Sequence, residues 1–346
     1  MIRKKLKIGV LFGGKSAEHK ISIASAKEVL RHLDPVKYEA YPVFISKDGL
    51  SWQILGKEEF LALQTPIQLL EEQSRKQQRS RTLERIAHRS MAEIKKQRVD
   101  IVFIALHGPF GEDGTVQGFL ELLDIPYTGS KVLASALGMN KAASRKLFAE
   151  SGLTVPKYTV LKKGEGTTTI RRKFKPPFVT KPLNQGSSVG VSIIHKKSEL
   201  LDGLDTAFNY SDQVIIEEYL VGTEVTVGIL GNKSPEALPV VEIVPKTEFF
   251  SFEAKYNESL CDEICPARIS KKLIEKAQKS AILAYKTIGC RAFARVDMII
   301  KDGEPHILEI NTIPGLTFVS LVPKAAKVAG ISYPQLLEQV ISYSLE

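Results

Sequence analysis

Residues 294–312 read ARVDMIIKDGEPHILEINT and contain two strand-like runs on either side of an Asp-Gly pair. An Asp-Gly pair between two such runs is a strong signal for a β-hairpin. A three-residue loop at 302–304 predicts that Asp297 lies directly opposite Glu309 in this hairpin. The segment therefore predicts two carboxylates side by side on a single ribbon of two strands.

A third oxygen-bearing side chain joins this pair. Glu309 and Asn311 are two positions apart in one strand, so they point to the same face. Buried carboxylates without a positive partner are costly, and oxygen ligands of this kind suit Mg²⁺ bound to nucleotide phosphates. A salt bridge between Arg295 and Asp297 is the alternative interpretation, but the two residues are two positions apart and point the same way. The cluster of oxygen-bearing side chains therefore remains rich in acid. We therefore predict a metal site at Asp297, Glu309 and Asn311.

Residues 176–194, PPFVTKPLNQGSSVGVSII, contain a second feature that suits a nucleotide. The Gly- and Ser-rich loop at 185–190 joins two strands. Such a loop can fold over a triphosphate, with backbone N–H groups and hydroxyls on the phosphate oxygens. Lys181 ends the preceding strand and can place a positive charge on a phosphate. An ordinary hairpin turn is the alternative interpretation, because loops with these residues are common.

Residues 9–16, GVLFGGKS, match the P-loop pattern, but we do not interpret them as a P-loop. A P-loop arches around a phosphate over its four middle residues, whereas three of these, 10–12, continue an apolar strand that begins at Ile8. We predict a buried strand and then a tight turn at 13–18. The backbone N–H groups of this turn and the start of the following helix can hold a small polar ligand.

The composition is that of a globular protein of a reducing compartment. The chain has 346 residues, of which 43% are apolar, enough for one large domain or for two to three small ones. Three cysteines, an odd number, argue against a disulfide scaffold; Cys261 and Cys265 have no second Cys or His pair nearby for a metal. Apolar runs such as 101–106 fall short of the roughly 18–20 residues that cross a membrane. We therefore expect a cytoplasmic protein with no membrane partner.

The formal charge of +9 permits a nucleic-acid partner, but the distribution of the charge argues against one. Much of the excess lies in residues 75–98, which are rich in Gln, Lys and Arg and have few aromatics for base stacking. A solvated basic helix in an insertion is the simpler interpretation. A positive field also favours anionic substrates such as nucleotide phosphates.

The order of strand and helix signals divides the chain into three parts. Residues 1–132 alternate strands with helices, which predicts an α/β unit with a parallel sheet. Residues 133–221 carry a helix, short strands and the Gly-Ser loop. Residues 222–346 carry further strands, the acidic hairpin and two helices. The predicted fold class is α/β, with α+β character in part.

Together these motifs resemble the D-alanine–D-alanine ligases of the ATP-grasp superfamily. The resemblance covers nearly the whole chain, through GGKSAEHKIS, ALHGPFGEDGTVQGFLELLDIPYTGS, LGMNKAASRKLF, VTKPLNQGSSVGVS, IIEEYLVGTEVTVGIL, FEAKYN, CPA, GCRAFARVDM and LEINTIPGLT, in the family's order. It implies an ATP-grasp fold of three domains with a Rossmann-like N-terminal sheet, two Mg²⁺ (or Mn²⁺) ions and a homodimer. The implied reaction is the ATP-dependent joining of two D-alanines through an acyl phosphate, a cytoplasmic step of peptidoglycan precursor synthesis in cell-wall formation.

The resemblance assigns the nucleotide site. Lys141 and Lys181 match phosphate-binding lysines of the family, and Lys255 resembles a further phosphate contact. Ser188 lies in the loop that closes on ATP. Residues 217–220 resemble the adenine-binding segment, and Glu224 matches the ribose-binding carboxylate. The implied ATP-binding residues are Lys141, Lys181, Ser188, Glu217, Glu218, Leu220, Glu224 and Lys255. The predicted metal ligands Asp297, Glu309 and Asn311 match the family's magnesium ligands.

The resemblance also assigns five catalytic residues. Glu18 matches the carboxylate that holds the ammonium of the first D-alanine, and in the family it is linked to Ser187 and Tyr256. Arg295 resembles the residue that steadies the developing negative charge. Gly315 supplies a backbone N–H beside it.

Two further residues match substrate contacts. His107 resembles a contact to the first D-alanine, and Ser320 resembles a hydroxyl that binds the carboxylate of the second. Without the resemblance, His107 is interpreted as a structural histidine at a strand end, and Ser320 as either a helix cap or a ligand.

The chain departs from the family at several positions. Lys20 and Gln185 stand where acidic residues are usual, Glu218 where Lys is frequent, and Phe250 where Tyr is frequent. The adenine is read mainly by backbone, so the change at Glu218 is expected to have little effect. D-lactate and D-serine are alternative second substrates. Tyr256 favours D-alanine, because family members that make the depsipeptide lack the matching Tyr.

Three other functions fit parts of the sequence. One is an ATP-grasp ligase for a different acid and amine. A nucleic-acid-binding protein would use the basic stretch but would leave the acidic hairpin unexplained. A regulatory ATP binder would have lost Arg295 or the metal carboxylates, all of which are present.

Overall fold

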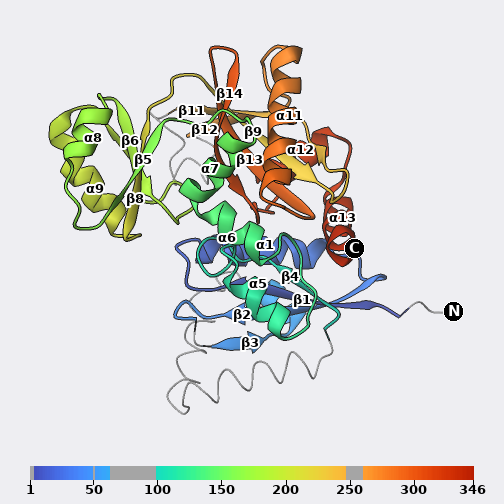
Figure 1. The fold of residues 1–346 in the computed structure, drawn as a ribbon. Helices are drawn as coiled ribbons and strands as arrows, with labels where there is room; N and C mark the ends of the chain where they lie inside the picture. The colour runs from blue at the N-terminus through green and yellow to red at the C-terminus, as the bar shows by residue number, and fades with distance from the viewer. Residues whose placement is uncertain (1–3, 50, 63–98, 247–259) are drawn as a thin grey trace.

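The N-terminal part forms a mostly parallel sheet, as predicted. A computed structural model describes residues 4–49, 51–62, 99–246 and 260–346. Strand β1 pairs in parallel with β2 and β4, and β3 closes the edge in antiparallel pairing (Figure 1). The sequence does not predict β3, which is too short to show a period. The strands are β1 (Leu6–Gly13), β2 (Tyr38–Ile45), β3 (Trp52–Ile54) and β4 (Ile101–Ile104).

Helix α1 (His19–His32) covers this sheet. Ile23, Ala26 and Leu30 recur at helical spacing and are buried, so one face of the helix packs on β1. The other described helices of this part are α2 (Lys57–Ala62) and α5 (Thr115–Leu122).

Residues 9–13 belong to strand β1, which confirms that they are not a P-loop. Gly9 pairs with Tyr41 on one side and Val102 on the other. Gly13 then turns the chain with a φ of +95°, and a Cβ at that position would lie 2.2 Å from the carbonyl oxygen of Ile45. Only glycine fits this turn.

The central part is a separate antiparallel sheet that forms the yellow-green lobe at the left of Figure 1. Its strand order is β5-β8-β6-β7, and α8 and α9 cover it with a small core of their own. Helices α6 and α7 precede it and lie at the centre of the molecule. The elements are α6 (Val132–Met139), α7 (Lys141–Glu150), β5 (Tyr158–Lys162), α8 (Thr168–Lys173), β6 (Phe178–Pro182), β7 (Ser192–Ile194), a 3₁₀ turn (Lys197–Glu199), α9 (Leu200–Phe208) and β8 (Gln213–Glu218).

The C-terminal part builds the largest sheet, in the order β12-β11-β9-β13-β14, with β10 paired to β9. Helix α11 packs on β9, β13 and β14, and α12 packs on β9. The elements are β9 (Thr223–Leu230), β10 (Glu236–Ala237), β11 (Val241–Pro245), β12 (Cys261–Ile264), α11 (Lys271–Thr287), β13 (Phe293–Lys301), β14 (Glu304–Asn311), α12 (Leu321–Val328) and α13 (Tyr333–Leu345).

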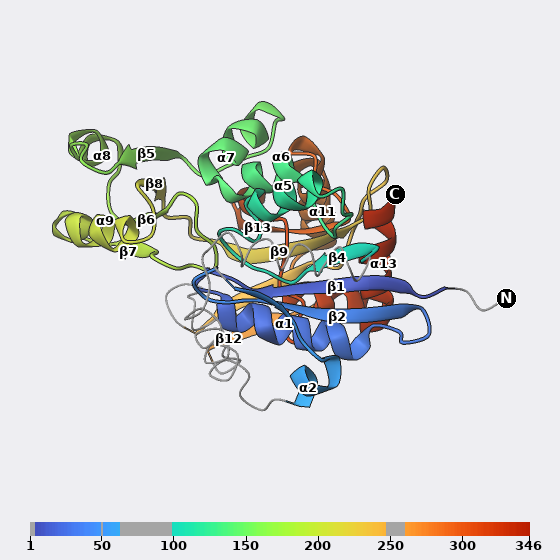
Figure 2. The ribbon, with the colours of Figure 1, turned by 90° about the horizontal axis from the view of Figure 1, so that it is seen from below.

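The N-terminal and C-terminal parts share one core. Ile8 and Phe103 of the parallel sheet belong to the same buried cluster as Leu336, Val340 and Ile341 of the last helix, α13. Figure 2 shows α13 beside the N-terminal strands. The last helix is therefore part of the packing of the first sheet.

The predicted pairing of Asp297 with Glu309 is confirmed, but the predicted three-residue loop is wrong. Lys301 pairs with Glu304, so the loop has two residues, both with positive φ, as a type I′ turn requires. A β-bulge at Leu308 then restores the register, because Ile307 pairs with Met298 and Glu309 with Asp297.

Some predictions fall on residues that the structure does not describe. The basic stretch 75–98, Phe250, Lys255 and Tyr256 all lie outside the described ranges. Among the described helices, none has the length and apolar character that crossing a bilayer demands.

Candidate active site

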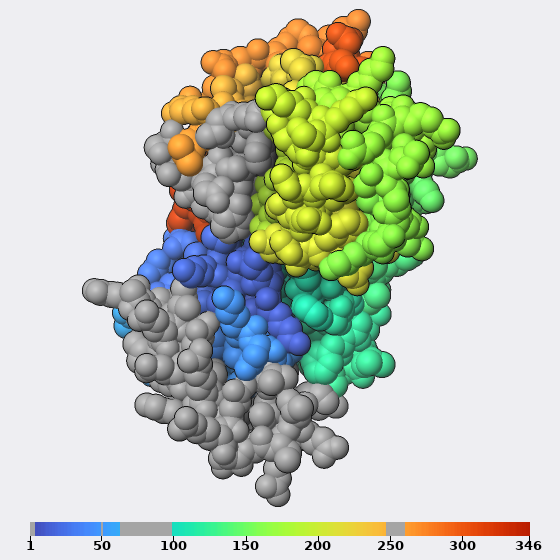
Figure 3. Space-filling view, turned by 90° about the vertical axis from the view of Figure 1, so that its left-hand side faces the viewer, coloured from blue at the N-terminus to red at the C-terminus, as the bar shows by residue number. Residues whose placement is uncertain are grey.

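Two adjoining cavities lie among the three sheets, each with a volume of about 920 Å³. Three residues, Lys141, Gln185 and Glu309, line both cavities and mark their junction. Figure 3 shows the central lobe, in yellow-green, lying directly against the blue and teal N-terminal part. The cavity lined by Lys181, Glu217 and Leu220 is called the nucleotide cavity, after the ligand that the sequence predicts for these residues. The cavity lined by Glu18, His107 and Ser320 is called the amino-acid cavity for the same reason.

The nucleotide cavity lies between the central and C-terminal sheets. Val179 and Ile193 line it from the central sheet and Ile299 and Leu308 from the hairpin, so apolar side chains of both sheets suit a flat ring between them. The predicted nucleotide and metal residues that line it are Lys141, Lys181, Ser188, Glu217, Glu218, Leu220, Glu224, Asp297 and Glu309.

A buried charge cluster forms one wall of this cavity. Lys181 Nζ lies 2.7 Å from Glu217 Oε1, and Arg145 Nη1 lies 2.5 Å from Glu217 Oε2. Burial acts to raise the pKa of Glu217, but the neighbouring cations Arg145 and Lys181 outweigh it and lower that pKa. Burial lowers the pKa of Lys181, while Glu217 opposes the change. The cluster has two cations for one carboxylate, which favours an anionic ligand.

Lys141 stands at the junction of the cavities. Its Nζ lies 3.0 Å from Glu309 Oε2 and donates a hydrogen bond of 2.5 Å to the carbonyl of Gln185. Helix α7 begins at this residue, with the side chain of Asn140 capping the backbone N–H of Ala143. A single lysine thus ties the Gly-Ser loop to the acidic hairpin.

The interpretation that sets aside a salt bridge between Arg295 and Asp297 is wrong. Arg295 Nε and Nη2 donate to the two oxygens of Asp297 at 2.8 and 2.7 Å, and Thr226 Oγ1 donates to Asp297 at 2.5 Å. Residues two apart on a strand share a face, and the long arginine side chain folds back to reach its neighbour. Both oxygens of Asp297 are therefore engaged by side chains.

The donor chemistry of Asp297, Glu309 and Asn311 fits a hard divalent cation, because all three offer oxygen and sit on adjacent strands. The positions next to the carboxylates are filled by the chain's own cations, Arg295 and Lys141. Within the described ranges, no three His, Cys, Asp or Glu side chains are grouped for a metal. Asp297, Glu309 and Asn311 are therefore the residues whose oxygens would hold a cation at the hairpin.

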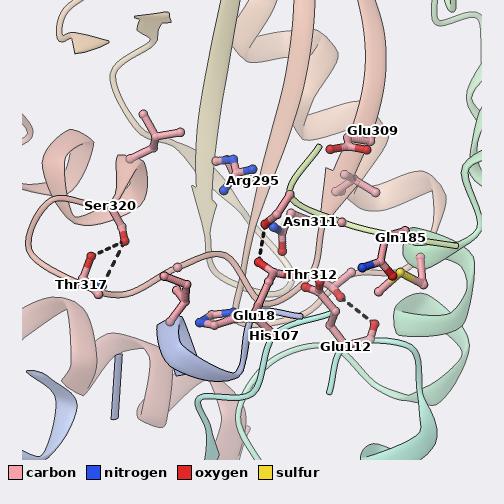
Figure 4. Close-up of a pocket in the computed structure, with 18 of the residues that line it drawn as sticks. Glu18, His107, Glu112, Gln185, Arg295, Glu309, Asn311, Thr312, Thr317 and Ser320 are labelled. Atoms are coloured by element: carbon pink, nitrogen blue, oxygen red, sulfur yellow. Dashed lines mark hydrogen bonds between the residues drawn. The ribbon is translucent and has the colours of Figure 1, made fainter. Parts of the chain in front are cut away.

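The amino-acid cavity brings Glu18 and Ser187 together from distant parts of the chain. Glu18 is buried directly before helix α1, and the Ser187 hydroxyl of the Gly-Ser loop donates a hydrogen bond to its Oε1. Figure 4 shows Glu18 and His107 on the floor of the cavity, with Arg295 and Asn311 above them. The link between Glu18 and Ser187 agrees with the one expected from the family.

His107 lines the same cavity but uses both of its ring nitrogens on protein partners. Nδ1 lies 3.1 Å from the carbonyl of Ile313, which can only accept, so Nδ1 carries the proton. Nε2 then accepts from the hydroxyl of Ser25 at 3.1 Å. Burial lowers the pKa of His107, which favours this neutral form. The residue therefore acts as a tie between the N-terminal sheet and the loop after β14, and a substrate contact would be made by ring carbons.

Glu112 is a second buried carboxylate in this cavity, and the sequence analysis does not identify it. Its Oε1 accepts from the backbone N–H of Gly108 at 2.9 Å. Burial, and then the negative charge of Glu18, raise the pKa of Glu112 to about 8. Glu112 lies in the motif HGPFGEDG at 107–114, but an acidic residue in a loop is normally expected to be exposed to solvent.

The far side of the cavity is a loop that carries Gly315 and Ser320. Ser320 occupies the N-cap position of α12, yet its side chain makes no capping bond. Its hydroxyl instead accepts from the backbone N–H of Thr317 at 3.1 Å and lies 2.8 Å from Thr317 Oγ1 (Figure 4). The helix-cap interpretation is therefore incomplete, and the hydroxyl faces the cavity that Arg295 and Gly315 also line.

Two family models match the chain. The model described as "D-ala D-ala ligase N-terminus" matches residues 7–130, and "D-ala D-ala ligase C-terminus" matches residues 147–342. A "D-alanine--D-alanine ligase" of Pelotomaculum thermopropionicum is 39% identical over 350 residues, which cover 99% of this chain and 97% of that protein. The chain belongs to the D-alanine–D-alanine ligase family.

Solved structures agree with this membership. The D-alanine–D-alanine ligase of Bacillus anthracis complexed with ATP is 34% identical, with a TM-score of 0.74 over 98% of this chain and 97% of that one. The VanG D-Ala:D-Ser ligase of Enterococcus faecalis is 31% identical, with a TM-score of 0.80 over 99% of this chain and all of that one. The chain is therefore a ligase with the ATP-grasp fold of this family.

Of the residues that the family resemblance assigns, all those within the described ranges line one of the two cavities. Arg145 joins Glu112 as a residue at the site that the sequence analysis missed. Arginine side chains are ordinarily exposed, and nothing in the sequence of helix α7 around Arg145 indicates that this one is buried.

Proposed function

We propose that this ligase joins two D-alanine molecules and converts ATP to ADP and phosphate. The observation that carries the proposal is the junction of the two cavities, where Lys141, Gln185 and Glu309 line both. A γ-phosphate held in the nucleotide cavity would meet a carboxylate held in the amino-acid cavity at this point. Apolar side chains and lysines on one side, and buried carboxylates on the other, suit a nucleotide and an amino acid respectively.

In the first step, the carboxylate of the first D-alanine attacks the γ-phosphate, and the bond to ADP breaks. Glu18 holds the ammonium of this substrate, which points its carboxylate toward the junction. Lys141 and Lys181 offset the negative charge on the phosphates, so the chain contributes mainly position and electrostatics. The product is an acyl phosphate. Ser187 and Ser188 lie on the loop that would cover it and exclude water.

In the second step, the amine of the second D-alanine attacks the acyl carbon in its deprotonated form. Arg295 and the backbone N–H of Gly315 stabilise the oxyanion that forms. The hydroxyl of Ser320 holds the carboxylate of the second substrate. Phosphate then leaves with the electrons of the acyl C–O bond and takes up the proton that the attacking nitrogen gives up, and D-alanyl-D-alanine remains.

Asp297, Glu309 and Asn311 are the residues that would hold two Mg²⁺ (or Mn²⁺) ions. Such ions, when bound, offset phosphate charge. Lys255 and Tyr256 would add a phosphate contact and a contact near Glu18, as in the family.

D-serine is a second candidate for the nucleophilic substrate. The VanG structure, named as a D-Ala:D-Ser ligase, aligns over 99% of this chain with a TM-score of 0.80, so the fold accommodates either substrate. Tyr256, as in the D-alanine enzymes of the family, favours D-alanine over D-lactate. The proposal is therefore D-alanine as second substrate, with D-serine as the comparison.

The setting of the reaction is also part of the proposal. We place the enzyme in the cytoplasm, as a homodimer that supplies peptidoglycan precursors, without nucleic-acid or membrane partners. We divide the chain at about residues 132 and 221. Each of the three resulting parts contains one of the three sheets.

The test is ADP release with ATP and Mg²⁺, measured with D-alanine, L-alanine, D-serine and D-lactate, with each product identified by mass spectrometry. Release that depends on D-alanine, with D-alanyl-D-alanine as the main product, is the expected result. A main product that contains D-serine would move the protein to the second candidate. ATP turnover without any dipeptide would refute both.

A further inference from the structure

Arg145 is a charged side chain that is completely buried, with 0% of its surface exposed. Its Nη1 forms the ion pair with Glu217, and Nε and Nη2 both donate to the carbonyl of Leu308, at 3.0 and 2.9 Å. Its guanidinium also lies 5.6 Å from the ring centre of Tyr158. Arg145 itself lines neither cavity, although its partners Glu217 and Leu308 line the nucleotide cavity, and the proposed reaction does not use this residue.

The carbonyl of Leu308 is available because of the bulge in β14. Leu308 has no partner in the register of β13, since Ile307 and Glu309 take the neighbouring positions opposite it. A bulge leaves its extra residue out of the hydrogen-bond ladder, and an unsatisfied buried carbonyl is costly. Arg145 satisfies that carbonyl. The next residue, Glu309, lies at the junction of the cavities.

The two partners of Arg145 belong to opposite walls of the nucleotide cavity. Glu217 is the penultimate residue of strand β8 in the central sheet and pairs with Lys181, whereas Leu308 lies in the hairpin of the C-terminal sheet. Arg145 and Lys141 are four residues apart on α7, so they lie on the same face of that helix. Lys141 pairs with Glu309 while Arg145 holds the residue before it.

We propose that Arg145 is a positioning residue for the nucleotide, which sets Lys181 through Glu217 and sets Glu309 through the carbonyl of Leu308. The planar guanidinium donates in several directions at once from a fixed fork, so it can bind a carboxylate on one wall and a carbonyl on the other. This inference rests on the proposed function, because it assigns a role within the ATP site.

The test compares Arg145→Met and Arg145→Lys with the unchanged chain. The measurements are the dissociation constant of a non-hydrolysable ATP analogue with Mg²⁺, and the KM values for ATP and for D-alanine. We expect Arg145→Met to weaken analogue binding and raise the KM for ATP about tenfold, with the KM for D-alanine within about twofold. Arg145→Lys keeps the charge but reaches only one partner, so its values should fall between the two.

Lys146→Met is the matched control, because it removes a cation from the exposed face of the same helix. Its analogue binding should change less than about twofold. The path through Glu217 is tested by the pair Glu217→Gln and Glu217→Gln with Arg145→Met. If Arg145 acts through Glu217, adding Arg145→Met to Glu217→Gln should cost much less than the tenfold loss that it causes alone.

The outcomes separate this inference from the proposed function. Failure of the unchanged chain to bind the analogue would overturn the proposed function. Normal binding by the unchanged chain and equal binding by a folded Arg145→Met would overturn the inference, even if that variant melts at a lower temperature. Should Arg145→Met not fold, Arg145→Lys decides: unchanged analogue binding and an unchanged KM for ATP overturn the inference, and a selective rise in both supports it.

Discussion

Five carboxylates that line the two cavities differ in the kind of partner that they have. In the nucleotide cavity each of Glu217, Glu309 and Asp297 is paired with a lysine or arginine of the chain. In the amino-acid cavity Glu18 accepts from a hydroxyl and Glu112 from a backbone N–H. The first arrangement has its negative charge already balanced and suits an anionic ligand. The second keeps two acids close together, which suits a ligand that brings a positive charge, such as an ammonium group.

The largest effect is expected at the junction, which belongs to both cavities. Glu309→Gln should lower kcat for phosphate release by about 10²–10³-fold, because it removes the charge that pairs with Lys141 and would bind a metal. The measurement is coupled ADP release with saturating ATP and D-alanine. Near-normal ATP turnover would remove Glu309 from the reaction and would leave the two cavities functionally separate.

A smaller and one-sided effect is expected from Glu18→Gln. The amide keeps the shape but loses the charge that holds an ammonium, so the KM for the first D-alanine should rise about 10–100-fold. Binding of an ATP analogue should stay within about twofold, since Glu18 lines only the amino-acid cavity. An equal loss in both affinities would contradict the division of labour between the cavities.

The protonation of Glu112 in the amino-acid cavity is expected to make the free energy of unfolding depend on pH. Its pKa is raised to about 8 by burial and by Glu18, so the folded chain keeps a proton that the unfolded chain loses near pH 4.5. The folded state therefore binds more protons between these values, and its free energy of unfolding falls as the pH rises from about 5 to 8.

Glu112→Gln removes that proton and keeps an acceptor for Gly108. We expect the variant and the unchanged chain to have similar stability near pH 5, and the variant to gain about 2–4 kcal/mol relative to it near pH 8. Denaturant unfolding at both pH values measures the difference. A constant offset across the range would mean that Glu112 is ionised in the folded protein. Arg295 and Glu309, which also act on its charge, are unchanged in this comparison.

The smallest effect concerns the choice of second substrate. Tyr256→Phe should raise the fraction of D-alanyl-D-lactate formed when D-alanine and D-lactate compete, by about threefold, which corresponds to the loss of one hydrogen bond. Product ratios by mass spectrometry provide the measurement, with total ADP release as the control. An unchanged ratio would refute the role of this tyrosine in selecting the nucleophile.

Much of this architecture follows from local pattern. The buried strands, the glycine turn at residue 13 and the pairing of Asp297 with Glu309 could all be predicted from apolar runs and turn residues. The pairing was predicted from a loop of three residues, whereas the loop has two. The extra residue of the bulge at Leu308 shifts the register by one, which brings Asp297 and Glu309 opposite each other. A bulge has no reliable local signal, because it depends on what the extra residue can bind elsewhere in the fold.

The residues that sequence reasoning missed or misjudged are those whose charge is settled by distant partners. Arg145 is buried only because Glu217 and Leu308, far along the chain, accept from it. The pKa of Glu112 is raised by burial and then by the nearby charge of Glu18, and both causes depend on the folded structure. The ion pair of Arg295 with Asp297 depends on which cations are present, and composition alone cannot rank arginine against a metal.

Because the first sheet and the last helix share one core, the sheet cannot be fully packed before that helix has been synthesised. Side chains near residue 340 fill the same buried cluster as strand β1. During translation the first strands leave the ribosome long before the helix that covers part of them. The N-terminal sheet must therefore wait, incompletely packed, until the residues near 340 have been made.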